Sequence, residues 1–253
     1  MREKDRKFES QVLSTACLAG KILLLNGSET DRVEKSICDI VEYYGYIPQS
    51  FVILTCIIIS LKDKEGEIIS LVERVQGRGT NLSKVHKVDT LIKNIDNYSL
   101  EEMTRYLEKI ETKKSYSFLV NILGSCLGAS FFTVLFKGNI WDFFIAFIGG
   151  GIIACICQIQ KIFKMGPVYT NILCGLITSI LVIICLKLGF INDIKVPIIS
   201  ILMIMVPGVP FINSIRDIFS GDLVTGLSRF SEVILVGCSL AIGSGIAVKL
   251  LNF

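Results

Sequence analysis

The sequence has 253 residues, of which 51% are hydrophobic and 19% charged, and its mean hydropathy is +0.61. This composition is typical of a chain embedded in a membrane. The net charge of +3 is small, and the sequence carries no basic stripe with interleaved aromatic residues, which argues against nucleic acid as a partner.

Charged residues divide the chain into two parts. Residues 1–115 carry 18 Lys and Arg and 18 Asp and Glu, whereas residues 116–253 carry 8 and 5. We therefore predict a soluble α+β domain over residues 1–114, followed by a transmembrane helical domain over residues 115–253. The charged start of the sequence does not resemble a signal peptide, so we expect the soluble domain in the cytoplasm.

Two helices are expected at the start of the soluble domain. The first covers Glu9–Leu25 and is stopped by Asn26-Gly27. The second carries apolar residues at helical spacing as far as Tyr44, and Ser28-Glu-Thr-Asp31 before it resembles a capping box. Both signals place the junction of the two helices at residues 26–31.

A β-hairpin and two more helices complete the soluble domain. Phe51–Leu61 is a β-branched run and Glu67–Val75 alternates in polarity, with a turn-like segment between them. The last helix begins at a capping box formed by Ser99 and Glu102. This part of the chain is polar enough to stand in water.

Five runs of uncharged residues in the second part predict membrane-spanning helices. They are Ser115–Phe136, Phe143–Gln160, Met165–Leu186, Val196–Ile215 and Val233–Val248. The Lys and Arg residues beside these spans number six on the side of the N-terminal domain and four on the other, which favours a cytoplasmic N-terminus. We therefore expect a multi-pass protein of the plasma membrane, with Phe253 outside.

Small residues recur at four-residue spacing within three of the spans. They are Gly124/Gly128, Ala146/Gly150/Ala154 and Gly237/Ala241/Gly245. Such ridges let helix backbones approach closely in lipid, and packing within the chain is the simpler interpretation. Five short spans leave little room for a transport pathway, so we expect a homo-oligomer or a complex with a second small membrane protein.

The fourth expected span is interrupted near its end by Pro207-Gly208-Val209-Pro210. Each proline removes a backbone donor, and the freed carbonyl groups must find other partners in lipid. A structural kink, or a helix end at the membrane interface, is one interpretation. The other is a binding site, because transporters tend to bind their cargo at interrupted helices.

Polar residues follow this break at close spacing. They are Asn213, Arg216, Asp217, Asp222, Arg229 and Glu232. If they face one cavity, either arginine could hold a substrate carboxylate while one of the acidic residues meets an ammonium group. The same carboxylates could bind and release a proton, because burial raises their pKa. The alternative is a set of salt bridges in a cytoplasmic loop.

The sequence gives no sign of a metal, a cofactor or an enzymatic site. The nine cysteines lie almost entirely in apolar runs, and His86 is the only histidine. Neither a zinc-type ligand spacing nor a nucleophile with a neighbouring base is visible. We therefore expect a small molecule and the lipid bilayer as binding partners, without a cofactor.

Segments at both ends of the chain resemble the threonine/serine exporter family. One is residues 26–34, Asn-Gly-Ser-Glu-Thr-Asp-Arg-Val-Glu, and the other is the proline motif with the polar residues that follow it. The residues that the family motif marks in the first segment are Gly27, Thr30, Arg32 and Glu34. The resemblance covers essentially the whole chain. Longer members have roughly twice as many spans, whereas shorter members are paired with a separate small membrane protein.

The resemblance and the residues together suggest a secondary transporter, or a subunit of one. Its expected cargo is a small amino acid like serine or threonine, or an organic acid, exported across the plasma membrane with coupling to the proton gradient. The alternative is a membrane-anchored sensor or assembly subunit without transport activity of its own. A pure anchor would have no reason to break a helix at Pro207 and Pro210.

Overall fold

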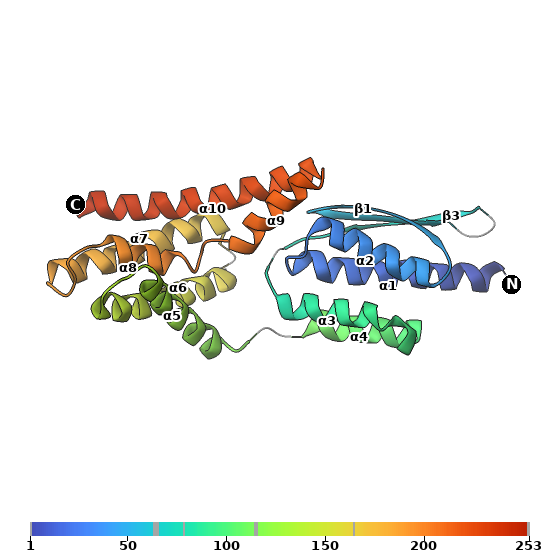
Figure 1. The fold of residues 1–253 in the computed structure, drawn as a ribbon, viewed down its shortest axis with the longest axis horizontal. Helices are drawn as coiled ribbons and strands as arrows, with labels where there is room; N and C mark the ends of the chain where they lie inside the picture. Colours follow the sequence, from blue (N-terminus) through green and yellow to red (C-terminus); the bar gives the residue numbers. More distant parts are fainter. Residues whose placement is uncertain (1, 63–65, 78, 114–115, 164, 252–253) are drawn as a thin grey trace. The chain divides into compact units, whose positions relative to one another are not determined.

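A computed structural model describes residues 2–62, 66–77, 79–113, 116–163 and 165–251. The chain is mostly helical with one small sheet (Figure 1), and it forms two compact units. The first unit contains Met1–Lys114 together with Gly208–Phe230, and the second contains Ser115–Pro207 together with Ser231–Phe253. A short segment from the apolar half of the sequence therefore belongs to the first unit.

The first two helices meet at a tight turn. Helix α1 (Arg2–Leu25) ends before Gly27, as predicted, and Gly27 has a positive φ of 92°. The Ser28 N–H donates to the Leu23 carbonyl at 3.1 Å, which closes α1 in the manner of a Schellman motif. Helix α2 (Thr30–Tyr43) follows at once.

The capping box expected at residues 28–31 is wrong. The N-cap of α2 is Glu29, and its side chain makes no capping hydrogen bond in the part of the chain that the structure describes. Ser28 lies one position too early for this role, because its backbone completes the end of α1. The helix nevertheless begins where the sequence indicated.

In place of the expected hairpin, the structure has a three-stranded antiparallel sheet of order β1-β2-β3. Its strands are β1 (Ile47–Ile53), β2 (Cys56–Lys62) and β3 (Ile68–Arg74). The prediction of one strand over Phe51–Leu61 was wrong, since the chain reverses at residues 54–55 and Ile53 pairs with Cys56. Leu54-Thr55 lacks the Asn-Gly or Gly signals by which two-residue turns are recognised.

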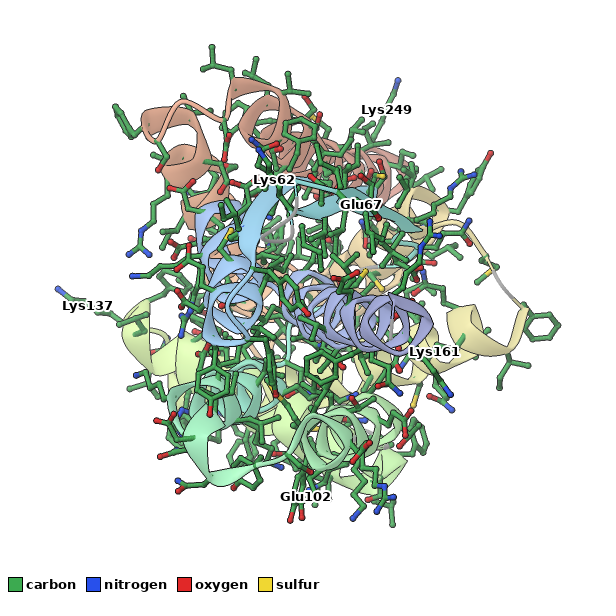
Figure 2. The ribbon with its side chains drawn as sticks, turned by 90° about the vertical axis from the view of Figure 1, so that its right-hand side faces the viewer. Lys62, Glu67, Glu102, Lys137, Lys161 and Lys249 are labelled. Carbon is green, nitrogen blue, oxygen red and sulfur yellow. The ribbon has the colours of Figure 1, made fainter. Side chains whose placement is uncertain are left out.

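Helices α3 (Leu82–Lys93) and α4 (Leu100–Thr112) are joined by a short 3-10 turn. The capping box at the start of α4 is confirmed: Ser99 N–H donates to Glu102 Oε2 at 2.9 Å, and Glu102 N–H donates to Ser99 Oγ at 3.3 Å. Figure 2 shows Glu102 at the outer edge of this helix pair. In the first unit the sheet covers one side of α1 and α2, and α3 and α4 cover the other (Figure 1).

Five helices are long and apolar enough to cross a membrane, judged by length and composition alone. These stretches lie in α1, α5 (Phe118–Leu135), α6 (Ile140–Phe163), α7 (Pro167–Lys187) and α10 (Leu223–Leu250). The stretch in α1 belongs to the first unit, where Leu13, Ala16 and Leu23 are buried in the core. Four of the five expected spans therefore correspond to α5, α6, α7 and α10.

The remaining expected span, Val196–Ile215, is not one helix. Helix α8 (Lys195–Leu202) is followed by turns at residues 203–207, and α9 (Gly208–Phe219) begins after them. Pro207 cannot donate a helical hydrogen bond and disfavours helical geometry in the residue before it. Pro210 lies in the first turn of α9, where its missing N–H costs nothing.

In the second unit, several helix ends lie on the same side. A Cβ atom placed on Gly138, just after α5, would lie 2.8 Å from Val196 Cγ1 at the start of α8. Lys187 at the end of α7 donates from Nζ to the Leu251 carbonyl, just after α10, at 3.2 Å. Figure 2 shows two other lysines near helix ends, Lys137 and Lys249, projecting away from the ribbon.

Glycines in the second unit are of two kinds. A Cβ atom on Gly175 of α7 would lie 2.5 Å from the Leu240 carbonyl of α10, and one on Gly243 of α10 would collide with the Ile172 carbonyl of α7. At Gly237 and Gly245, by contrast, the same test meets no described atom within 4 Å. The glycines that close the α7–α10 contact are therefore outside the ridge expected from the sequence.

This difference predicts opposite effects for two similar substitutions in α10. Gly243→Val should destabilise the second unit by about 1–3 kcal/mol or more, because the α7 backbone cannot yield to a side chain. Gly237→Val should leave the stability of the single chain within about 0.5 kcal/mol, since no described atom of the chain lies near this site. Thermal unfolding of both variants in one detergent measures the contrast, and equal unfolding temperatures would contradict the α7–α10 packing.

Candidate functional site

The candidate site lies in the first unit, where α9 and the start of α10 meet the turn between α1 and α2. Asn213, Ser214 and Asp217 form the buried face of α9. Asn213 and Asp217 are four residues apart, so both side chains leave the same side of the helix. They contact the backbone of residues 27–30.

Three contacts join α9 to that turn. Asn213 Nδ2 donates to the Gly27 carbonyl oxygen at 2.9 Å, and the Thr30 N–H donates to Asp217 Oδ1 at 3.4 Å. Arg216 forms an ion pair with Glu29 at the exposed edge, where 60% of the arginine side chain is accessible. The two segments that the sequence singled out, nearly 190 residues apart, therefore form one site.

Arg229 reaches the same place from α10. Its Nε lies 3.5 Å from Asp217 Oδ2, and the two side chains are only 7% and 2% exposed. Its Nη1 and Nη2 donate to the Ser28 carbonyl oxygen at 3.5 and 3.4 Å. These distances are at the long limit for hydrogen bonds, so the charge pair is buried without tight geometry.

Several oxygen atoms in the site are buried without a partner among the described residues. They are Ser28 Oγ, Thr30 Oγ1, Asp217 Oδ2 and Asp222 Oδ2. Asp217 Oδ2 does face Arg229 as an ion pair, although it accepts no hydrogen bond. Buried polar atoms are nearly always satisfied, so a cluster of exceptions marks a place where a ligand, a proton or water can bind.

Burial raises the pKa of the Asp217 carboxyl, and the Arg229 guanidinium and the Thr30 N–H oppose this only in part. Burial also raises the pKa of Asp222, and the Asp31 carboxylate raises it further. The pKa of Glu34 is raised by burial, although its Oε1 accepts a hydrogen bond from the Val52 N–H at 2.8 Å. The surroundings of Asp217, Asp222 and Glu34 thus favour the protonated form of these three carboxyl groups.

The other expected site residues have different surroundings. Arg32 forms an ion pair with Asp89 of α3. Pro207, Gly208 and Pro210 lie at the start of α9. Glu232 is exposed on the part of α10 that belongs to the second unit.

Sequence reasoning missed three members of this site. Ser28 and Asp31 were assigned to a helix capping box, and Glu29 was given no role of its own, yet all three contact or face residues 216–229. The available signal was the run of polar residues from 26 to 34 itself. Among the residues that the structure describes, no three His, Cys, Asp or Glu side chains are placed to hold a metal ion.

Comparison with known proteins identifies the family of the chain. A family model described as "Putative threonine/serine exporter" matches residues 14–251, nearly the whole chain. The chain belongs to the threonine/serine exporter family. The family is one of transporters and not of enzymes, and the apolar helices α5, α6, α7 and α10 are those of a multi-pass membrane protein.

Two known relatives are similar to this chain over almost all of the chain's length. A protein of Corynebacterium glutamicum named "Threonine/serine exporter" is 26% identical over 97% of this chain, which covers 52% of that protein. A protein of Klebsiella aerogenes named "Probable succinate transporter subunit YjjP" is 22% identical over 96% of both chains. The chain therefore spans about half the length of the first relative, and no solved structure matches it.

Proposed function

We propose that this chain is a secondary transporter, or one subunit of a transporter, that exports a small amino acid or organic acid across the plasma membrane. Its cargo resembles serine or threonine, and export is coupled to the proton gradient. The first unit, apart from α9 and α10, is proposed to be a soluble cytoplasmic domain over residues 1–114, and the rest of the chain to be transmembrane.

The buried Asp217–Arg229 pair is the observation that supports this function best. A guanidinium group that is desolvated and only loosely held can bind a carboxylate, which every proposed cargo carries. Asp217 and Asp222 have raised pKa values and can bind a proton. Arg216 is exposed and already paired with Glu29, so Arg229 is the better candidate for the carboxylate.

The pairing with another chain is a second part of the proposal. The Klebsiella aerogenes relative is named as a transporter subunit and has nearly the same length as this chain. The open small-residue ridge at Gly237 and Gly245 offers a surface for close helix contact. We therefore propose an oligomer, formed with a second copy or with a separate small membrane protein.

Uptake into inverted membrane vesicles tests the function. Vesicles that contain the chain, alone or with a candidate partner, receive labelled serine, threonine or succinate and a proton gradient imposed in one direction or the other. We expect accumulation of at least one substrate, and its collapse when a protonophore removes the gradient. Vesicles without the chain are the control, and no uptake under any of these conditions would refute transport.

A membrane-anchored sensor or assembly subunit is the second candidate. The contacts of Asn213, Asp217 and Arg229 with residues 27–30 would also serve to fix α9 against the first unit. In that case the polar residues hold the fold and carry no substrate. This function would be favoured if uptake requires the chain but every substrate binds only to the partner protein and not to the chain.

A further inference from the structure

The N-terminus of α2 is capped by a residue from the other end of the chain. The first N–H groups of a helix have no acceptor within it, and they carry partial positive charge. In α2 the N-cap Glu29 does not supply an acceptor from its side chain among the described residues. The Asp217 carboxylate takes this place, accepting from the Thr30 N–H while it faces Arg229.

A helix N-terminus and a buried arginine together are the donors that recognise a ligand carboxylate. We propose that the N-terminus of α2 and Arg229 form the subsite for the carboxylate of the transported acid, and that the ionised Asp217 occupies this subsite when no substrate is bound. The inference rests on the proposed transport function. It adds that Asp217 competes with the cargo for the same donors.

The contacts of Asp217 are weak enough for a substrate carboxylate to displace this side chain from the subsite. Both of its interactions are long, 3.4 Å to the Thr30 N–H and 3.5 Å to Arg229 Nε. The Ser28 hydroxyl is buried in the same turn and has no hydrogen-bond partner in the described part of the chain, whereas the Thr30 hydroxyl already favours the ionised Asp217. A substrate carboxylate with its own polar groups can therefore gain contacts that Asp217 does not make.

Protonation decides which carboxylate holds the subsite. A proton from the cytoplasmic water, bound at an Asp217 carboxyl oxygen, neutralises the side chain and releases Arg229 and the Thr30 N–H. The other charged groups around Asp217 are Asp222 beyond α9, Asp31 and Glu34 on α2, and the Arg216–Glu29 pair at the edge. The Asp222 carboxylate opposes ionisation of Asp217, so proton uptake and substrate binding favour each other, and the proton leaves the cytoplasm together with the cargo.

Binding to the purified full-length chain in detergent tests this linkage. Succinate, serine and threonine serve as probes, and calorimetry in buffers of different ionisation enthalpy measures the protons taken up. For the wild type we expect uptake of up to one proton for each substrate bound. Above the pKa of Asp217, affinity should fall about tenfold for each pH unit. Binding with no proton uptake, and with the same affinity from pH 5 to pH 8, would overturn the inference.

Asp217→Asn imitates the protonated side chain and should bind substrate with an affinity that no longer depends on pH. In vesicles it should keep exchange of labelled for unlabelled substrate, while its net uptake no longer responds to the proton gradient. Asp193→Asn is the matched control, because Asp193 is an exposed acid in the second unit and should leave all these values unchanged.

Two failures are distinguishable. If the wild type binds and moves none of the probes, the proposed function fails and the subsite with it. If the wild type transports a substrate and Asp217→Asn keeps the same pH dependence, transport stands and the competition at α2 is refuted. Should the variant not fold, the proton uptake of the wild type decides alone.

Discussion

Replacing Arg229 by glutamine should abolish efflux and destabilise the first unit by about 3–5 kcal/mol. The substitution leaves the Asp217 carboxylate buried without its counter-charge, and a lone buried charge costs far more than a lost surface contact. It also removes both contacts to the Ser28 carbonyl and the donor that we propose for the substrate. Efflux from preloaded cells and thermal unfolding of the purified variant measure the two effects.

Two further variants separate stability from transport. The double variant Arg229→Gln/Asp217→Asn removes both charges, so it should regain most of the lost stability without regaining efflux. Arg216→Gln is the matched arginine control, because its pair with Glu29 is exposed and should contribute at most about 1 kcal/mol. Normal efflux from a correctly folded double variant would exclude this pair from the transport site.

The sequence predicted those elements whose signals are local. Gly27 ends α1 because a glycine readily takes the positive φ that closes the helix, and Ser99 with Glu102 caps α4 through neighbouring backbone groups. The uncharged runs likewise located α5, α6, α7 and α10. Each of these signals acts within a few residues of the element that it marks.

What the sequence could not predict depends on distant contacts. The reversal at Leu54-Thr55 has no turn residue to announce it, and only pairing with β3 on its other edge fixes β2. The sequence predicted Ser28 as the cap of α2, because nothing in it shows that Asp217 accepts the hydrogen bond from the Thr30 N–H at the start of this helix. Both polar segments were recognised as candidates, but their contact became visible only when the chain was folded.

A reporter fused after the end of α10 should lie outside the cell, and one fused before α1 should lie in the cytoplasm. In the second unit, the end of α5 meets the start of α8, and the end of α7 meets the end of α10. Between the start of α5 and the end of α10 the chain therefore traverses this unit an odd number of times. Helices α5, α6, α7 and α10 account for four passages, and α8 with residues 203–207 must supply the fifth.

The position of the reporter after α10 depends on whether α8 and residues 203–207 make the fifth passage. The eight residues of α8 rise only about 12 Å, against about 30 Å for the hydrocarbon core, so turns at 203–207 must continue the crossing. Non-helical backbone is tolerated at that depth only where protein surrounds it, and Ile204 and Met205 do pack against the core of the second unit. A fusion after Lys187, three passages in, should also lie outside. A cytoplasmic reporter after α10 combined with an external one after Lys187 would mean that residues 195–207 do not cross.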